Sequence, residues 1–502
     1  MLLRNQIYVT EIMGDFPSWA LQHRKPGTEL RCINGHYYLY AVSSSWDKET
    51  KKTKKITGHI IGKINPDGEL VPSKRRAAKV KGVAKNPLQF ADKISVKEFG
   101  LSNFFISHMK DVCEQLKACF PSHWQYIIAA AYCRLYKQSP INQMPLHIHH
   151  SYLSEQLKDA VFDEKNISLA LRDVGRDREQ AVRFMKWDIP EGEHVLIDLT
   201  HLPSRSSNGA FAQPGHNNQK NYDGQINLLY IFGNQSLKPV FYRIVPGNIR
   251  ELSAFVLTIE ESGIKPCILI MDKGFYSLKN TGYLAKNKFN FICPLKRDSQ
   301  LVKKEDRAKL SEKEQAQYFE YMGRIIWCVK IQPADKNKQI YLYLNDELRT
   351  KEERDYLIRI ANKPESYSMK KFSQKKSHFG TLSLLTNLSD KSAEHIYQVY
   401  KSRNQIEMMY DGFKGVLEAD KTYMQNEETL QGWTLANHVA LLAHHRIYQL
   451  LLTSGKIKKH SIGAFIERLA LVRKARVNGQ WVDTEVIKQS LKLFEQVGVP
   501  VT

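Results

Sequence analysis

The sequence predicts a mixed α/β protein of several domains, for three reasons. The chain has 502 residues, which is more than one ordinary domain contains. Hydrophobic residues make up 42% of the chain, so sizeable cores can be buried. Apolar runs of strand length also alternate with segments whose apolar residues recur at helical spacing, as expected for a sheet covered by helices.

Taken in order, these patterns divide the chain into six segments. They are a β-rich basic region at 1–90, a helical region at 91–188, the first part of an α/β core at 189–298, a β-rich insertion at 299–385, the second part of the core at 386–455 and a helical tail at 456–502.

The first segment is predicted to contain short strands joined by turns. Residues 36–42 and 57–64 are rich in Tyr, Leu and Ile, and the charged stretch 46–55 between them is typical of a hairpin. A second basic run lies at 74–81. Lysines on a two-stranded ribbon can follow a phosphate backbone, although a solvated loop is an equal alternative for either run.

The core and its insertion are predicted from apolar runs. In the core, runs typical of buried strands lie at 194–198, 226–232, 239–245 and 267–272, and a helical pattern lies at 253–262. In the insertion, a charged stretch at 303–313 precedes strand-like alternation at 324–330, 339–344 and 381–385. Two helices are expected after it, a long amphipathic one at 390–416 and an apolar one at 434–453.

Composition limits the kinds of partner and site. Lys and Arg number 74 against 52 Asp and Glu, a net charge of +22, which favours a polyanionic partner such as nucleic acid. The seven cysteines are scattered without a CxxC pair, which argues against structural zinc and disulfides and fits a reducing cytoplasm. The most apolar stretch, 435–452, contains three histidines and an arginine, so a buried helix is expected there, not a membrane span.

Two aspartates are placed by the strand pattern. Asp198 and Asp272 each end a predicted apolar strand, and such acids face the crevice beyond the sheet edge, where ligands tend to bind. Either aspartate alone is better explained as a turn or helix-cap residue. Two of them in one predicted sheet favour a shared site.

A third carboxylate lies on the long helix predicted at 390–416. At about 100° per residue, four polar side chains share a stripe about 60° wide: Tyr400, Arg403, Glu407 and Lys414. Such a stripe suits a site that binds metal and phosphate together, whereas the alternative is a solvated face with an Arg403–Glu407 ion pair. Three carboxylates fit two Mg²⁺ ions for phosphodiester chemistry, with Asp198 as the expected bridging ligand.

These residues resemble a known family. The spacing of the four helix residues reproduces the Tyr-(2)-Arg-(3)-Glu-(6)-Lys signature of a large group of bacterial insertion-sequence DDE transposases. The sequences beginning at Asp198 (Asp-Leu-Thr) and Asp272 (Asp-Lys-Gly-Phe) resemble the two aspartate motifs of that group, and Val-Pro-Gly-Asn at 245–248 is also similar. The resemblance covers about 190–455. Tyr410 stands where phenylalanine is usual, a difference that concerns packing.

The resemblance implies a ribonuclease-H-like catalytic core with a β-rich insertion before the glutamate helix. It implies that Asp198, Asp272 and Glu407 are catalytic and hold two Mg²⁺ ions, for which Mn²⁺ is expected to substitute. DNA contacts are assigned by the same resemblance to Tyr400, Arg403, Lys414 and Lys273. Related enzymes hold a flipped base on an aromatic residue of the insertion; Trp327 is the candidate here, and a core tryptophan is the alternative.

The expected function is therefore cut-and-paste transposition. The enzyme would bind the terminal inverted repeats of an insertion sequence, hydrolyse a phosphodiester and join the released 3′ end to target DNA by transesterification. Its expected partner is double-stranded DNA, as a homodimer, in the bacterial cytoplasm at the nucleoid and not at a membrane. One alternative is a catalytically silent DNA-binding descendant, which should have lost a catalytic acid. A cellular nuclease is another, and the Tyr-Arg-Glu-Lys signature argues against it.

Overall fold

A computed structural model describes residues 16–47, 52–73, 94–189, 192–204, 206, 211–214, 224–248, 251–313, 315–403 and 424–501. The chain forms two compact units, Met1–Ile94 and Ser95–Thr502. Glu407 and Lys414 lie outside the described residues, as does the basic run 74–81.

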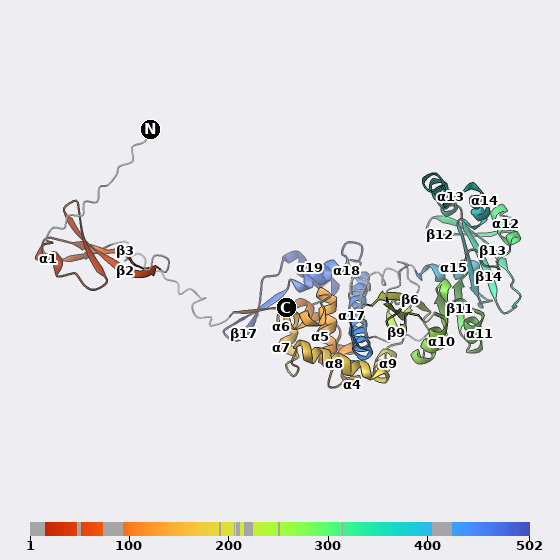
Figure 1. Ribbon diagram of the computed structural model, residues 1–502, viewed down its shortest axis with the longest axis horizontal. Coiled ribbons are helices and arrows are strands. Elements are labelled where there is room, and N and C mark those ends of the chain that lie inside the picture. Colours follow the sequence, from red (N-terminus) through yellow and green to blue (C-terminus); the bar gives the residue numbers. More distant parts are fainter. Residues whose placement is uncertain are drawn as a thin grey trace. The chain divides into compact units, whose positions relative to one another are not determined.

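The first unit is a four-stranded antiparallel sheet with one short helix (Figure 1). Its elements are α1 (Ser18–Leu21), β1 (Thr28–Ile33), β2 (His36–Asp47), β3 (Lys52–Ile64) and β4 (Leu70–Pro72). Its small core contains Leu30 and Leu39 from neighbouring strands, and Trp19 of α1 packs edge-on against Tyr37. Strands are thus present in the region where the sequence predicted them.

The second unit begins with one strand and a run of helices. They are β5 (Ser95–Glu98), α3 (Gly100–Ser107), α4 (Lys110–Cys119), α5 (Trp124–Lys137), η2 (Ile141–Gln143), α6 (Met144–His149), α7 (Leu153–Gln156), α8 (Glu164–Arg176) and α9 (Arg178–Lys186). Aspartate side chains cap α8 and α9, where Asp163 accepts from Asn166 N and Asp177 from Gln180 N.

The next ten described strands along the chain join one sheet. They are β6 (Val195–Pro203), β7 (Gln213–Pro214), β8 (Gly224–Gly233), β9 (Pro239–Pro246), β10 (Ile268–Met271), β11 (Asn290–Pro294), β12 (Gln317–Tyr321), β13 (Arg324–Ile331), β14 (Gln339–Asn345) and β15 (Thr381–Thr386). Strands β6, β10 and β11 run parallel, whereas β8 is antiparallel to β6 and β9 to β8. The mixed α/β class is confirmed.

The helices of the sheet region lie between these strands in sequence, except α15, which follows β15. They are α10 (Glu251–Ser262), η3 (Lys273–Phe275), α11 (Leu278–Lys286), α12 (Lys304–Glu312), α13 (Asp346–Asn362), α14 (Met369–Lys375), η4 (Lys376–His378) and α15 (Ala393–Lys401). Strand β15 pairs with both β11 and β14, so residues 299–385 extend the core sheet itself. This region also contains α12, α13 and α14, where the sequence analysis recognised only a charged stretch and strands.

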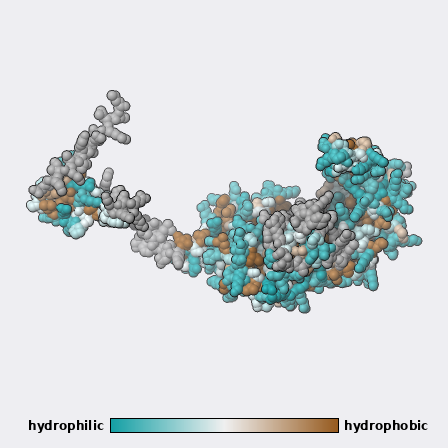
Figure 2. Space-filling model, in the orientation of Figure 1, coloured by the Kyte–Doolittle hydropathy of each residue, from teal (hydrophilic) through white to brown (hydrophobic). Residues whose placement is uncertain are grey.

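The missed helix α13 has a physical explanation. Tyr356 is its only buried residue, and its apolar residues Leu348, Leu357 and Ile358 are exposed. A helix without an apolar stripe gives no helical period in the sequence. The surface around α13 and α14 is correspondingly mainly hydrophilic in Figure 2.

The C-terminal part returns to the helical region. It contains α17 (Glu427–Thr453), α18 (Ile462–Ala470), β16 (Arg473–Val477), β17 (Gln480–Asp483) and α19 (Lys488–Val497). Helix α17 lies beside α5 and α8 (Figure 1), and most of its residues from Leu430 to Ile447 are buried. The hairpin β16–β17 adds to β5, an element that the sequence analysis did not predict. Among the described helices, none is long and apolar enough to cross a membrane.

Candidate active site

Two of the predicted acids come together on neighbouring parallel strands. Strand β10 pairs with β6 so that Met271 lies opposite Ile197, and the next residues along the two strands are Asp272 and Asp198. Residues at the same register of parallel strands point to the same side of the sheet. The sheet therefore places both carboxylates at one site.

The structure corrects the position of one aspartate in its strand. Asp272 directly follows β10, as predicted, and begins the short turn η3 without a side-chain capping bond. Asp198, however, lies within β6, which continues to Pro203 and pairs with β8 along its whole length. The crevice at this site is thus formed where β10 ends beside a strand that continues.

Arg403 joins the two carboxylates. Its Nη1 donates to Asp272 Oδ1 at 2.8 Å, and its Nη2 lies 3.8 Å from Asp198 Oδ1. The arginine side chain is 12% exposed, compared with 20% for Asp198 and 35% for Asp272. Burial alone would lower the pKa of Arg403, but the hydrogen bond and charge of Asp272, with the charge of Asp198, raise it above its ordinary value.

The third predicted acid cannot be placed in this geometry. Helix α15 begins at its cap Ser392, whose side chain accepts from His395 N, and it carries Tyr400 toward the same site as Arg403. Glu407 and Lys414 fall on residues outside those described. The structure therefore brings together Asp198, Asp272 and Arg403, with Tyr400 beside them.

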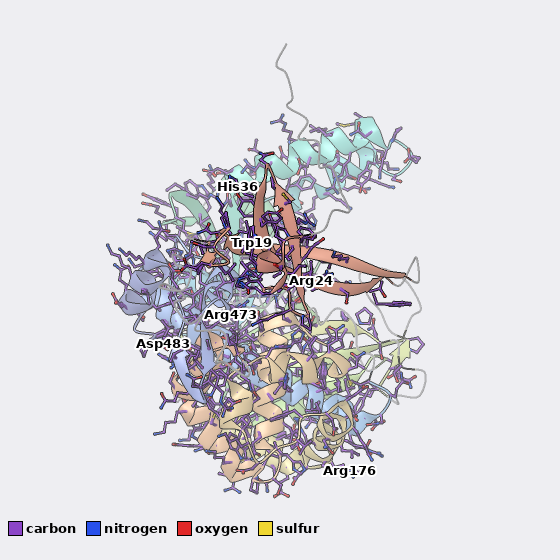
Figure 3. The ribbon with its side chains drawn as sticks, turned by 90° about the vertical axis from the view of Figure 1, so that its left-hand side faces the viewer. Trp19, Arg24, His36, Arg176, Arg473 and Asp483 are labelled. Carbon is purple, nitrogen blue, oxygen red and sulfur yellow. The ribbon has the colours of Figure 1, made fainter. Side chains whose placement is uncertain are left out.

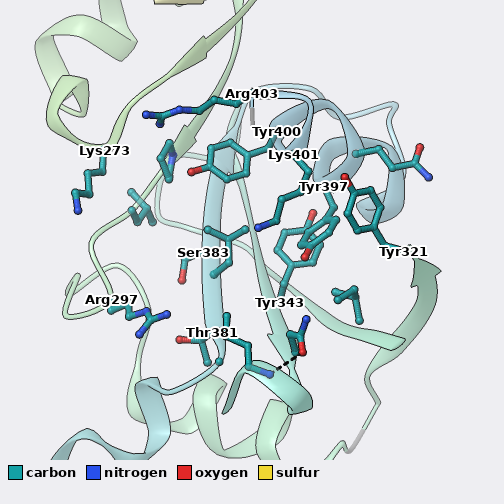
Figure 4. A pocket seen from close by; sticks show the side chains of 18 of the residues that line it. Lys273, Arg297, Tyr321, Tyr343, Thr381, Ser383, Tyr397, Tyr400, Lys401 and Arg403 are labelled. Carbon is teal, nitrogen blue, oxygen red and sulfur yellow. Dashed lines mark hydrogen bonds between the residues drawn. The ribbon is translucent and has the colours of Figure 1, made fainter. Parts of the chain in front are cut away.

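A large groove opens next to these residues. Its cavity volume is about 1090 Å³, and Asp272, Lys273, Tyr400 and Arg403 line one part of it. Figure 4 shows Tyr397, Tyr400 and Lys401 of α15 along one side and Lys273 and Arg297 on the other, with Ser383 of β15 between them. The groove thus runs from the carboxylates along the extension of the sheet.

The groove is basic and aromatic in character. Its cationic lining residues are Lys273, Lys296, Arg297, Arg324, Lys401 and Arg403, and its tyrosines are Tyr321, Tyr343, Tyr397 and Tyr400. Arg297 forms a two-contact pair with Glu352, and Arg324 pairs with Glu347 at 3.2 Å, both at the surface. Cations beside tyrosine rings suit a polyanion that also offers flat rings, which is the chemistry of a nucleic acid strand.

Trp327 lies apart from the groove. Arg324 and Ile326 of the same strand line it, and because side chains alternate along a strand, Trp327 points to the opposite face of the sheet from Ile326. There its ring lies 5.4 Å from that of Tyr318, with Lys313 Nζ 4.5 Å from its centroid. Stacking of a flipped base on Trp327 stays a prediction, and the groove offers tyrosines in its place.

The carboxylate pair fits a divalent cation by its donor chemistry. Both aspartates keep part of their side chains exposed, and Arg403 already shows that the pair accepts a positive charge. Carboxylate oxygens are the ligands that Mg²⁺ prefers, together with water. Within the described residues no group of three or more His, Cys, Asp or Glu has the geometry of a metal site, and the predicted third ligand is not among them.

Several groove residues were not predicted from the sequence. Lys296 and Arg297 follow the end of β11, the third parallel strand, so the rule that identified Asp272 also applies to them. Arg324 and Tyr321 flank the β12–β13 turn and reach the groove because β14 and β15 connect that hairpin to β11. The position of these two residues at the groove follows only from the strand pairing of the sheet, which is not visible in the sequence.

Comparison with known proteins identifies the segment that contains this site. Residues 189–443 match the family model described as the transposase DDE domain, and this segment contains Asp198, Asp272 and Arg403. No curated protein matches the sequence. One similar solved chain comes from the cryo-EM structure of a piggyBac transposase synaptic complex with hairpin DNA, with 10% identity, a TM-score of 0.38, and coverage of 69% of this chain and 70% of that chain.

Proposed function

Because the chain belongs to the transposase DDE domain family, we propose that it is a DNA transposase whose active site lies where β6 and β10 bring Asp198 and Asp272 together. The observation that carries this proposal is the shared register of the two aspartates, each contacted by one arginine. Two adjacent carboxylates with a cationic groove beside them suit binding of metal ions and of a phosphodiester.

Each residue of the site has a role in this proposal. Asp198, Asp272 and Glu407 would hold two Mg²⁺ ions, or Mn²⁺ in their place. When bound, the ions activate the attacking oxygen and stabilise the leaving one. Tyr400, Arg403, Lys273 and Lys414 would hold the DNA end by its phosphates. Lys273 and Tyr400 line the groove, which supports these two assignments.

We also propose that the sheet is a ribonuclease-H-like core. In its centre the strand order is β9, β8, β6, β10, β11, with the first three antiparallel and the last two parallel to β6. This order and the aspartates on β6 and after β10 support the assignment. The full reaction would be cleavage at the inverted repeats of a bacterial insertion sequence and strand transfer into target DNA, by a homodimer at the nucleoid.

The first experiment tests cleavage directly. A duplex carrying the inverted repeat found beside the gene is incubated with full-length protein and Mg²⁺, and the products are separated on a denaturing gel. We expect cleavage at the repeat boundary by the wild type and a loss of at least a hundredfold for Asp272→Asn, because the substitution removes a metal-binding charge. Glu407→Gln should give the same loss.

The control is the same type of substitution, aspartate to asparagine, at a position away from the proposed site. Asp335→Asn changes an exposed aspartate in the β13–β14 turn, where it pairs with Lys338, and should cleave like the wild type. Binding without cleavage by the wild-type protein would contradict the proposal and favour a silent DNA-binding descendant. Equal cleavage by Asp272→Asn would remove that residue from the site.

A further inference from the structure

The β2–β3 hairpin extends beyond the sheet to which it belongs. Strand β1 pairs with β2 only up to Ala41, and β4 pairs with β3 only from Gly62. Within the described residues, no further strand pairs with the residues from Val42–Thr57 to Asp47–Lys52, although Val42 N–H still donates to the Gly27 carbonyl oxygen at 2.8 Å. These residues form a two-stranded ribbon, hereafter the ribbon (residues 42–47 and 52–57), visible as the long red strands of Figure 3.

No described side chain of the ribbon belongs to the core of its own unit. That core consists of residues from α1 and from the four-stranded part of the sheet, including Leu30, Leu39 and Ile64. In the ribbon Trp46 and Ile56 are exposed, with 61% and 46% of their surface accessible, whereas Val42 is half-buried. An isolated two-stranded ribbon is only marginally stable in water, so this one is suited to stabilisation by a partner.

The face of the ribbon that carries Trp46 is joined to the sheet by specific contacts. Ser44 lies opposite Lys55, and Trp46 opposite Thr53, so these four side chains share one face. Lys55 Nζ binds Glu29 at 2.9 Å. This contact links one end of the face to β1.

The same face continues onto the sheet. Arg31 Nη2 donates to Thr57 Oγ1 at 2.9 Å, and the Arg31 guanidinium lies 5.2 Å from the centroid of the Tyr40 ring. A register shift on either side of Tyr40 marks an irregularity in the pairing of β2 with β3, and such bulges increase the local twist. The ribbon is thus set at an angle that the sheet determines.

The chemistry of the ribbon indicates its partner. Residues 42–57 contain five lysines against Asp47 and Glu49, and three consecutive serines lie on β2. Small hydroxyl side chains hydrogen-bond base edges, lysines bind phosphates, and an apolar side chain can contact a thymine methyl group. Six paired residues span about 20 Å, and the major groove of straight duplex DNA, about 12 Å wide, admits a two-stranded ribbon, whereas the minor groove, about 6 Å wide, does so only when the DNA is bent and the groove widened.

We propose that the ribbon enters the major groove of duplex DNA and reads base edges with the face that carries Ser44, Trp46, Thr53 and Lys55. This inference rests on the proposed function only for the identity of the DNA, which would be the repeat at the end of the element. It assigns sequence recognition to the first unit and leaves the basic groove of the second unit to the cleaved strand. Lysine contacts with phosphates fix the register, and the hydroxyls select the sequence.

The test separates binding from cleavage. Full-length protein without divalent metal selects duplexes from a pool of 30-base-pair DNA with random central positions, and the enriched duplex is treated with dimethyl sulfate. This reagent methylates guanine N7 in the major groove and adenine N3 in the minor groove. We expect binding to be blocked by guanine N7 methylation over a few base pairs. Interference by adenine N3 alone would overturn the proposal, as would equally strong binding of single strands.

Three variants locate the contact on one face. The double change Ser44→Ala, Thr53→Ala should weaken binding of the selected duplex about tenfold and relax its sequence preference. Lys55→Ala should weaken all duplexes alike and reduce the salt dependence by about one phosphate contact. The matched control Ser43→Ala, Ser45→Ala alters the opposite face of the same strand and should bind within about twofold of the wild type.

The outcomes distinguish this inference from the proposed function. Equal effects of the two double variants would overturn base reading by the ribbon, even if the protein cleaves DNA in Mg²⁺. An effect confined to Ser44 and Thr53, in a protein that never cleaves, would support the ribbon and refute the transposase activity. Circular dichroism of each variant shows that the unit remains folded.

Discussion

Arg403 lies between two carboxylates that a metal site would need. With 2.8 Å to Asp272 and 3.8 Å to Asp198, its guanidinium offsets the repulsion between two negative charges on adjacent strands. A divalent cation bound to the same pair would serve the same electrostatic purpose. Arg403 and such a cation would therefore stabilise this part of the sheet in alternative ways.

Thermal unfolding tests whether Arg403 and a divalent cation stabilise the same pair of aspartates. Arg403→Gln leaves the aspartates without their common cation, so we expect a loss of about 1–2 kcal/mol, a modest value because Asp272 is partly exposed. Added Mg²⁺ should restore most of this loss, so the rise in melting temperature with Mg²⁺ should be larger in the variant than in the wild type. Differential scanning fluorimetry with and without MgCl₂ measures both.

A second arginine provides the control for this prediction. Arg297→Gln also breaks an arginine–carboxylate pair, with Glu352, but at the surface and away from the two aspartates. Its melting temperature should respond to Mg²⁺ as the wild type does. The same Mg²⁺ response in both variants would show that the cation does not bind between Asp198 and Asp272.

At the residue scale, the sequence predicted the position of Asp272 in its strand better than that of Asp198. Asp272 follows four buried apolar residues and precedes a turn, so the end of its strand is visible in the sequence. After Asp198 the strand continues through Leu199, Thr200 and His201, where burial alternates between the faces. Because polar and apolar residues alternate there, the second half of the strand is not recognisable in the sequence as a continuous apolar run, although it is still paired.

At the scale of elements, α8 and α17 cross at two glycines. A Cβ on Gly432 would lie 1.8 Å from the carbonyl oxygen of Leu171, and one on Gly175 would lie 1.6 Å from that of Glu428. Neither obstacle is a flexible side chain, so a methyl group would force the helices apart. The close approach explains why two poor helix formers lie inside these helices.

Substitution at this crossing should destabilise the protein strongly. We expect Gly432→Ala to lower the free energy of unfolding by about 3 kcal/mol or more, because overpacking against backbone cannot be relieved locally. Urea unfolding followed by circular dichroism measures the change. Gly463→Ala in α18, where a Cβ meets nothing within 4 Å, should instead be neutral or stabilising by up to about 1 kcal/mol. Similar values for the two variants would contradict the packing argument.

The elements could be predicted only where they bury an apolar face. Strand β8 is apolar and almost wholly buried, and most residues of helix α17 from Leu430 to Ile447 are buried; each element overlaps the segment that the sequence indicated. Helix α13 is exposed, and the hairpin β16–β17 is held by pairing to β5, more than 370 residues away in the chain. Neither exposure nor long-range pairing leaves a local period in the sequence.

At the scale of the whole molecule, α17 carries three buried histidines, and two of them, His438 and His445, contact the sheet region. Burial lowers the pKa of His438 to about 3 and the pKa values of His444 and His445 to about 4. His438 Nδ1 lies 2.5 Å from the Tyr230 hydroxyl of β8, and His445 Nε2 lies 2.8 Å from the Ser236 carbonyl oxygen. All three histidines stay neutral in the folded protein at neutral pH.

One buried carboxyl group, that of Glu98, changes the pH dependence of stability in the opposite direction. Burial raises the pKa of Glu98 to about 7, although Ser102 and Tyr132 donate hydrogen bonds to it. Between about pH 4.5 and 7 the folded chain therefore holds a proton on Glu98 that the unfolded chain releases. Over this range Glu98 makes the protein less stable as the pH rises, whereas the three histidines make it more stable.

Three histidines act against one carboxyl group, so their net effect is that stability falls as the pH falls. Below about pH 6.5 the unfolded chain takes up three protons on these histidines that the folded chain refuses, and Glu98 offsets one of them. Stability should therefore fall on acidification from about pH 6.5 to 4.5, on the order of 2 kcal/mol per pH unit. Urea unfolding at a series of pH values measures this slope, and a flat profile would contradict the argument.

A single substitution shows whether α17 is the source of the acid sensitivity. His445→Gln keeps a donor for the Ser236 carbonyl oxygen but cannot take up a proton, so the slope should fall by about one proton. The exposed His149 on α6 provides the matched control, because His149→Gln alters no buried group and should leave the slope unchanged. Equal slopes for the two variants would move the source of the acid response away from the contact between α17 and the sheet.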